Sequence, residues 1–180
     1  MRVVLAITGA SGAIYGLRLA EALEKQKEHE LHVIISKGAR KTAKAEGVKL
    51  PKFKQEYEEE EMEAGIASGS ARIDAMVICP CSMKTLAAIH AGYADNLVTR
   101  CADVMMKEQK KLIIVPRETP LSAIHLRNMY ELAKLGVHVV PAMPGFYHKP
   151  KSVDEIVDFM VGKVLDCLCV DNKMFKRWGE

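Results

Sequence analysis

The sequence lacks several features that would place the chain in a specialised class of protein. Aromatic residues make up only 6% of its 180 residues, and five cysteines are an odd number for a scaffold of disulfide bridges. No apolar run approaches the length of a membrane span, and the N-terminal stretch has no cleavage-type ending. Secretion, membrane insertion and a disulfide-dependent fold are therefore poor interpretations.

Net charge is also scarce, because 26 basic residues face 23 acidic ones and leave a formal charge of only +3. That excess is too small for a nucleic-acid-binding surface, and we expect neither nucleic acid nor a membrane as a partner. The 49% of apolar and 27% of charged residues are typical of a globular protein. We expect one domain over residues 1–180, in the reducing cytoplasm that suits unpaired cysteines.

Five short runs rich in Val, Ile and Leu recur along the chain without clean alternation of apolar and polar residues. Near-continuous hydrophobicity over so few residues is typical of strands buried on both faces, as in parallel sheets covered by helices. The expected strands are Val3–Ile7, Leu31–Ile35, Ala75–Cys79, Leu112–Val115 and Val137–Val140.

The segments between these runs show apolar residues at helical spacing. Helices are expected over Ala13–Lys27, Asn96–Glu108 and Leu121–Leu135. Thr119 and Pro120 have the pattern of an N-cap with a proline in the first turn, and Ser152 with Glu155 forms a capping-box pattern before a last helix. Alternating strands and helices predict an α/β fold, a doubly wound, Rossmann- or flavodoxin-like parallel sheet flanked by helices.

The stretch Pro51–Gly65 has the weakest pattern, and it contains four consecutive glutamates, Glu58 to Glu61. A run of like charge is usually a solvated helix face or a mobile loop. We interpret this stretch in that way.

Ligands of open parallel sheets bind in the crevice outside the carboxyl ends of the strands. The loops that follow the five expected strands are all rich in small, hydroxyl-bearing or charged residues. They cover residues 8–12, 36–38, 80–85, 116–120 and 141–148. We expect these loops to form the walls of one pocket.

The first of these loops has glycines at positions 9, 12 and 16, with Ser11 at its mouth. Glycine lets the backbone turn sharply, and the next helix would present unpaired N–H groups and a positive dipole end to an anion. The loop therefore predicts an anion cradle, with a tight turn that holds no ligand as the alternative.

This glycine spacing, together with Tyr130 and Lys134, resembles the pattern of short-chain dehydrogenases. However, Ser36 and Lys37 lie where an enzyme of that kind places an acid for the ribose of NAD. The chain is also short for that family, and no serine lies at the expected distance before Tyr130. A single anion cradle favours a mononucleotide such as flavin mononucleotide (FMN).

Two Cys-x-Cys pairs, Cys79 with Cys81 and Cys167 with Cys169, could suggest a zinc site. We expect the two cysteines of each pair to point in different directions, as residues two apart on a helix do. They are interpreted as small buried hydrophobic residues, and no metal is expected.

Several cations and one aromatic residue lie on or beside elements that lead into the crevice. Arg100 and Lys107 are seven residues apart on one expected helix, a spacing compatible with two cations that face a common phosphate. The single tryptophan, Trp178, could pin the C-terminal tail to the core or cover a ligand with carbocation-like charge.

The loops together closely resemble the flavin prenyltransferases of the UbiX/Pad type. The segments that carry the resemblance are GASGAIYGLRL, ISKGAR, CPCSMKTLAAI, NLVTRCADVMMKE, VPRETPLSAIHL and PAMPGFYHKPKSVDEIVDF. It runs from about Val3 to Trp178, with Pro51–Gly65 as its least constrained part.

The resemblance implies an enzyme that joins a dimethylallyl group to reduced FMN and closes an extra ring on the isoalloxazine. Dimethylallyl monophosphate is the implied donor, and no metal is implied. The product would be the cofactor of a separate UbiD-type decarboxylase. The family also implies a large homo-oligomer, commonly a dodecamer, whose active sites are shared between subunits.

The resemblance also assigns roles to residues. The implied FMN-binding positions are Gly9, Ala10, Ser11, Ser36, Ser82, Met83, Lys84, Thr85 and Arg117. The implied prenyl-phosphate positions are Arg100, Lys107, Tyr147 and Lys163, and the implied catalytic positions are Ser11, Glu46, Arg100, Lys107, Glu118 and Trp178. Lys163 departs from the arginine that relatives often carry there, and lysine lacks the bidentate geometry of arginine.

Two other functions are compatible with the same fold. One is a flavin-dependent decarboxylase of the Cys-decarboxylase group. This sequence lacks, in the expected form, the active-site histidine and the loop sequence of that group. The other is a non-catalytic FMN-carrier subunit of an aromatic acid decarboxylase. A carrier has no need for Arg100, Lys107, Tyr147 and Lys163 around a second phosphate.

Overall fold

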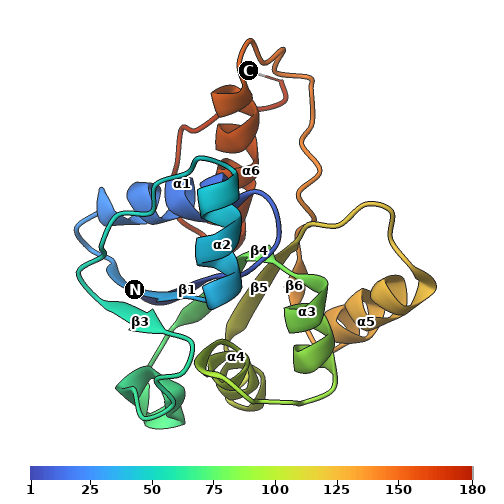
Figure 1. The fold of residues 1–180 in the computed structure, drawn as a ribbon. Coiled ribbons are helices and arrows are strands. Elements are labelled where there is room, and N and C mark those ends of the chain that lie inside the picture. Colours follow the sequence, from blue (N-terminus) through green and yellow to red (C-terminus); the bar gives the residue numbers. More distant parts are fainter. Residues whose placement is uncertain (180) are drawn as a thin grey trace.

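The computed structural model describes residues 1–179 and is built around a six-stranded sheet whose strands are all parallel (Figure 1). The strands are β1 (Arg2–Ile7), β2 (Glu30–Ile35), β3 (Glu56–Glu58), β4 (Ala75–Cys81), β5 (Lys111–Pro116) and β6 (His138–Val139). Their order is β3-β2-β1-β4-β5-β6, so the chain changes direction across the sheet between β1 and β4. The expected doubly wound α/β fold is confirmed, and its ligand crevice lies at this switch point.

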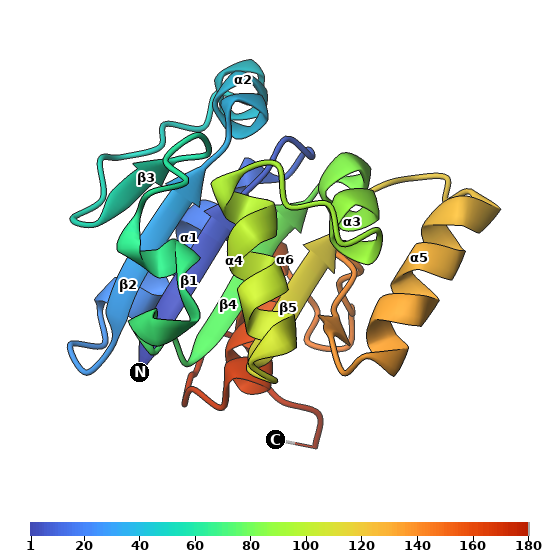
Figure 2. The same cartoon turned by 90° about the horizontal axis from the view of Figure 1, so that it is seen from below.

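Helices cover both faces of the sheet (Figure 2). They are α1 (Ala13–Glu24), α2 (Lys37–Ala45), α3 (Met83–His90), α4 (Leu97–Lys107), α5 (Ala123–Lys134) and α6 (Val153–Leu168), with short 3-10 turns at Gly65–Ala67 and Gly69–Ala71. Helices α1 and α6 lie on one face, and α3, α4 and α5 on the other. Within the described residues, no helix combines the length and hydrophobicity needed to cross a bilayer.

The two faces of each central strand are buried in different layers of core. In β1, Val3 and Leu5 pack with the α1 and α6 layer, whereas Val4 and Ala6 pack with the α3 and α4 layer. A strand with no solvent-facing side needs no polar residues. That is why the sequence shows continuous apolar runs here rather than alternation.

The interpretation of Pro51–Gly65 as a solvated helix face or mobile loop is wrong, because this stretch contains the edge strand β3. Its glutamates are paired, since the Arg40 guanidinium contacts Glu56 at 2.9 Å and Glu58 at 2.6 Å. Tyr57, between them, packs against the core. An edge strand with charged neighbours on both sides has no apolar run to reveal it.

The expected start of α5 is also wrong. Thr119 and Pro120 are joined by a cis peptide bond before the helix, and the N-cap is Ser122, whose hydroxyl accepts from the His125 amide at 3.2 Å. The capping box expected at α6 is half formed. The Ser152 hydroxyl accepts from Glu155 N–H, but the Glu155 carboxylate accepts from Lys151 N–H instead of the N-cap amide.

The cysteines at the end of β4 do face apart, although a regular strand would turn residues two apart to the same side. The pairing of β4 with β5 shifts register between Ile78 and Cys81. Cys79 consequently packs in the layer of α1 and α6, and Cys81 in the layer of α3 and α4. Cys79–Pro80 is a cis peptide.

Candidate functional site

The carboxyl ends of β1 and β4 are tied together by Thr8, which is only 1% exposed. Its hydroxyl donates to the carbonyl of Pro80 at 2.8 Å and accepts from the Ser82 amide at 2.8 Å. The two loops at the switch point are thus held by one buried side chain. Sequence reasoning did not single out Thr8, and the available signal was a hydroxyl residue directly after a buried strand.

The loop after β2 joins this arrangement through backbone contacts. The Ser36 amide donates to the Ile7 carbonyl at 3.1 Å, and the Ser36 hydroxyl caps α2 by accepting from Ala39 N–H at 3.0 Å. A methyl group added at Gly9 would lie 3.1 Å from the α-carbon of Gly38. The glycines therefore permit an approach between the two loops that side chains would prevent.

The prediction that α1 offers unpaired N–H groups to an anion is wrong. The amides of Gly12 and Ala13 donate to the two carboxylate oxygens of Glu46, at 2.7 and 3.0 Å. Glu46 follows α2 and caps α1 from a distance of more than thirty residues along the chain. A bound carboxylate satisfies these donors and repels a phosphate, so the start of α1 is not open to an anion.

A carboxylate also occupies the start of α2, where Lys37 N–H donates to Glu59 at 2.8 Å. Helix α3 differs. Within residues 1–179, the amides of Met83 and Lys84 in its first turn have no protein acceptor. The hydroxyls of Ser82 and Thr85 lie 3.0 Å apart beside them. At the switch point, the start of α3 is the one adapted to an anion.

Arg117 and Glu118 follow β5 and border the same edge. The Arg117 amide donates to the Cys81 carbonyl at 3.3 Å, which fixes it beside the start of α3. Its Nε is buried without a hydrogen-bond partner among the described residues. Buried donors are nearly always paired in proteins, so this atom fits a site for an anionic ligand. Both residues line a cavity of about 60 Å³ that continues to Pro141 and Ala142.

Arg100 and Lys107 are not brought to a common point within this chain. The Arg100 guanidinium contacts Asp103 at 3.0 Å and the carbonyl of Ala67 at 3.2 Å. The Lys107 ammonium pairs with Glu108 at the end of α4, about 10 Å further along the helix axis. Their predicted role toward one phosphate stays a prediction.

Tyr147 and Trp178 lie together in a second place, and Lys163 is linked to it through Asp166 and Arg177; we call these residues the tail cluster. The rings of Tyr147 and Trp178 meet edge to face at 5.2 Å. Lys163 lies 3.8 Å from Asp166, which also holds Arg177, the neighbour of Trp178, at 2.8 Å. Trp178 is 81% exposed, so within one chain it covers little. Figure 1 shows this segment beside α6, away from most of the sheet.

His148, next to Tyr147, is a further polar residue of this region. Its ring stacks on Phe159 with 5.0 Å between centroids and 5° between planes, yet both ring nitrogens are buried without a protein partner in the described residues. The ring borders a cavity of about 500 Å³ with Lys149, Lys176 and Trp178. Ring contacts thus hold the imidazole, and its two buried nitrogens lack the hydrogen bonds that buried polar atoms nearly always have.

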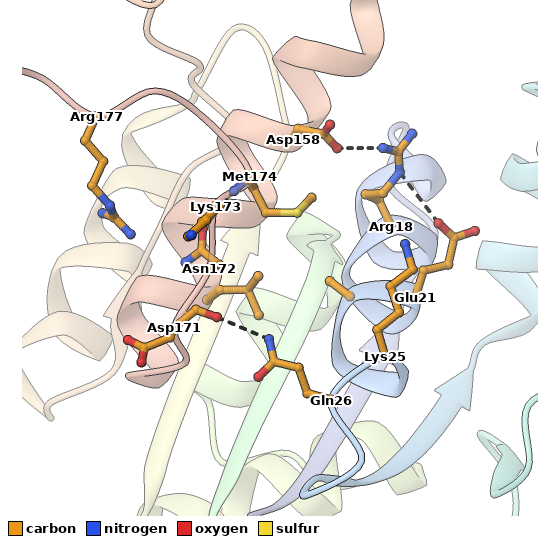
Figure 3. A pocket seen from close by; sticks show the side chains of 12 residues that line it. Arg18, Glu21, Lys25, Gln26, Asp158, Asp171, Asn172, Lys173, Met174 and Arg177 are labelled. Atoms are coloured by element: carbon orange, nitrogen blue, oxygen red, sulfur yellow. Dashed lines mark hydrogen bonds and ion pairs between the residues drawn. The ribbon is translucent and has the colours of Figure 1, made fainter. Parts of the chain in front are cut away.

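A large cavity of about 730 Å³ contains none of the predicted residues (Figure 3). It lies between α1, α6 and the C-terminal tail, and three of its charged side chains pair with one another. Arg18 contacts Asp158 at 2.6 Å and Glu21 at 3.6 Å. Cavity size alone therefore does not locate the chemistry of this chain.

The buried thiols are poor metal ligands. Burial raises the pKa of Cys81 and of Cys101 to about 12, and it raises the pKa of Cys79 well above its ordinary value. Among residues 1–179, no cluster of three or more His, Cys, Asp or Glu side chains is arranged to hold a metal ion.

Comparison with known proteins gives consistent matches. The flavoprotein family model matches residues 1–165. The flavin prenyltransferase UbiX of Methanocaldococcus jannaschii is 48% identical over 184 residues, which cover 99% of each chain.

Two solved structures resemble the whole chain. A dodecameric FMN-dependent UbiX-like decarboxylase from Escherichia coli O157:H7 superposes with a TM-score of 0.96 at 44% identity, over 100% of both chains. AnUbiX, in complex with FMN and dimethylallyl pyrophosphate, superposes with a TM-score of 0.95 at 43% identity, over 99% of this chain and 97% of that one.

Likeness to the cysteine decarboxylases is much weaker. The FMN-dependent cysteine decarboxylase SpaF has a TM-score of 0.63 at 17% identity, over 91% of this chain and 97% of that one. Such a match shows a shared fold and nothing more.

Proposed function

The chain belongs to the flavoprotein family and, within it, to the flavin prenyltransferases of the UbiX type, and on this premise we propose that it transfers a dimethylallyl group from dimethylallyl monophosphate to reduced FMN. The observation that supports the proposal is the presence of two separate groups of side chains that contain cations or unpartnered polar atoms. One lies at the switch point, around α3 and Arg117, and the other is the tail cluster. A flavin phosphate and a prenyl phosphate need two such places.

The switch-point residues fit FMN. The open first turn of α3, the paired hydroxyls of Ser82 and Thr85, and the unpartnered Nε of Arg117 suit a phosphate or a polar flavin edge. When bound, reduced FMN supplies the nucleophilic centre that accepts the prenyl group. The residues that we propose hold it are Gly9, Ala10, Ser11, Ser36, Ser82, Met83, Lys84, Thr85 and Arg117.

We propose that Arg100, Lys107, Tyr147 and Lys163 hold the prenyl phosphate, with neighbouring copies of the chain supplying some of them. The support is that Arg100 and Lys107 lie on α4, whereas Tyr147 and Lys163 lie with the tail cluster. The E. coli relative is dodecameric, and we propose a dodecamer for this chain also.

The chain's own groups can lower the barrier to cleavage of an allylic carbon–oxygen bond. Fixed cations stabilise the negative charge that develops on the leaving phosphate, and the indole face of Trp178 stabilises positive charge on the prenyl group. Glu46, bound to the amides of Gly12 and Ala13, keeps the turn that presents the Ser11 hydroxyl. Exclusion of water then protects the reactive prenyl group from hydrolysis.

Glu118 and the released phosphate are the groups that we propose handle protons. The Glu118 carboxylate is exposed beside Arg117 and accepts only the adjacent Thr119 amide, at 2.9 Å, among the described residues. The phosphate, held near the reaction centre, is the base that removes the ring proton.

We propose that a separate UbiD-type decarboxylase uses the product, the prenylated flavin, as its cofactor. We also propose a cytoplasmic location. Its support is the state of the five cysteines, of which Cys79, Cys81 and Cys101 are buried as free thiols.

The test is to incubate the protein with reduced FMN and dimethylallyl monophosphate, without added metal, and to measure the mass of the extracted flavin by mass spectrometry. A flavin heavier by one prenyl unit is expected. Unmodified FMN that stays bound would support the FMN-carrier alternative. Decarboxylation of a cysteine peptide would support the Cys-decarboxylase alternative, and either result would overturn the proposal. A parallel reaction with the diphosphate shows which donor is used.

A further inference from the structure

Helix α2 makes a carboxylate contact with another segment at each of its ends. At its start, the Lys37 amide donates to the Glu59 side chain at 2.8 Å. At its end, the C-cap residue Glu46 accepts the amides of Gly12 and Ala13 at the start of α1. Helix α2 therefore connects the acidic turn after β3 to the glycine-rich turn after β1.

Glu59 has a second contact through its main chain. Its carbonyl accepts from Leu97 N–H, at the start of α4, at 2.8 Å. The half-buried Glu59 thus contacts two helices. Its side chain contacts the start of α2, and its main-chain carbonyl contacts the start of α4, the helix that carries Arg100.

The first turn of α2 lies directly against the proposed flavin site. Ser36 is its N-cap, and Gly38 packs against Gly9 so closely that neither can gain a methyl group without displacement of the other. A shift of this turn by a fraction of an ångström would change the contact between Gly9 and Gly38. The Lys37 amide, which Glu59 holds, lies between Ser36 and Gly38 in the sequence.

We propose that Glu59 is a positioning residue for flavin binding, because its carboxylate fixes the first turn of α2 against the turn that contains Gly9. This inference rests on the proposed function, since it takes Gly9 and Ser36 as flavin-binding residues. Glu59 touches no proposed ligand and acts through Ser36 and Gly38. Its carbonyl bond to Leu97 is a separate support for the donor side, which side-chain substitutions leave in place.

Because the side-chain and main-chain contacts of Glu59 are separate, a side-chain substitution tests one and leaves the other as an internal control. Glu59→Ala removes the side-chain acceptor but keeps the backbone bond to Leu97. FMN dissociation constants, measured by quenching of flavin fluorescence, are expected to rise between about threefold and tenfold, the scale of a lost N-terminal helix contact. The KM for dimethylallyl monophosphate is expected to change less than about twofold.

Two further variants sharpen the measurement. Glu59→Gln keeps an oxygen that can accept from Lys37 N–H, so it is expected to recover most of the flavin affinity. Glu60→Ala is the matched control, because the one ion pair of the Glu60 carboxylate among the described residues is with the exposed Lys37 ammonium. It removes an acid of the same run and contacts the same lysine, but it is expected to leave both constants unchanged.

The outcomes separate this proposal from the proposed function. If the parent protein fails to bind FMN or to form the adduct, the proposed function fails, whatever Glu59 does. If the parent is active and Glu59→Ala binds FMN within twofold of it, the positioning role is wrong. A parallel rise in both constants with a lower melting temperature would also overturn it, since that is the signature of general destabilisation.

Discussion

The switch-point loops and the tail cluster are both rich in predicted site residues, but they are built in different ways. At the switch point, backbone amides and carbonyls of neighbouring strands bond to one another, as Ser36 does to Ile7 and Arg117 to Cys81. In the tail cluster, Tyr147 and Trp178 meet only through their rings, and one carboxylate, Asp166, joins α6 to the tail.

The difference indicates how much of each site a single chain can define. The switch-point site is a consequence of the sheet, so it forms when the core forms. The tail cluster lies on segments outside the sheet and leaves Trp178 exposed, so it depends on further contacts for its final shape. We therefore expect substitutions at the switch point to alter stability and flavin binding, and those in the tail to alter the use of the donor and the rate of prenyl transfer.

The largest expected effect is at Gly16, where α1 crosses β4. A methyl group there would lie 2.4 Å from the Cys79 carbonyl oxygen, which is backbone and has no room to move. Gly16→Ala is expected to lower the free energy of unfolding by about 3 kcal/mol, measured by urea denaturation. Gly65→Ala is the control, because a methyl group at Gly65 meets nothing within 4 Å. Equal midpoints for the two variants would refute the close packing.

Removal of the indole should separate catalysis from folding. Trp178→Ala is expected to slow prenyl transfer about thirtyfold, since the π-face is worth about 2 kcal/mol to a desolvated cation. FMN affinity and the unfolding midpoint should match those of the parent, because Trp178 is 81% exposed and contacts no switch-point loop. A loss of flavin binding in this variant would mean that the two regions are not independent.

At the switch point, Thr8→Val keeps the shape of the side chain but removes the hydroxyl that joins Pro80 to Ser82. Two buried polar groups then lose a partner, which is expected to cost about 1.5 kcal/mol of stability and to weaken FMN binding. Thr119→Val is the comparison for stability, since its exposed hydroxyl bonds only to the adjacent Glu118 carbonyl. The prediction fails if both valine variants unfold at the same urea concentration.

The smallest effect is expected from Asp166→Asn, which weakens the contacts with Arg177 and Lys163 in the tail cluster. Partly exposed ion pairs contribute about 0.5–1 kcal/mol, so the donor KM should rise a fewfold while FMN affinity stays constant. A hydrogen bond from Arg177 holds the pKa of Asp166 below its ordinary value.

The sign of the pH dependence follows from that shift. The contribution of Asp166 is complete above the ordinary pKa of an aspartic acid and is lost as the pH falls through the lowered value. The parent's donor KM should therefore show no change from this group between pH 8 and pH 5. If the donor KM of the parent rose toward that of Asp166→Asn between pH 8 and pH 5, the lowered pKa of Asp166 would be contradicted.

The sequence was sufficient to predict most of the sheet, while the binding roles of the residues at its edge stay predictions. Five of the six strands were visible as apolar runs, and their parallel order places the loops that carry Ser11, Ser36, Ser82 and Arg117 at the same edge. Strand β3 was missed because Glu56 and Glu58 are stabilised by Arg40, a partner that only the folded chain brings near.

The electrostatic details of the site were also beyond the sequence. Nothing in the pattern around Gly12 indicates that Glu46 caps α1, since a contact across thirty-four residues depends on the path of α2. The open start of α3 was recognisable only after the carboxylates at α1 and α2 had been located. The separation between Arg100 and Lys107 was obscured because residues seven apart share a helix face but not a position along it.

The mutual contact of Gly9 and Gly38 has a consequence for how such proteins diversify. Because each α-carbon occupies the space that the other's side chain would need, a single substitution at either position is penalised even when its chemistry suits a new ligand. Directed evolution toward altered flavins should therefore find few routes through these two turns. Adaptation is easier along the rim, where exposed side chains can be exchanged one at a time.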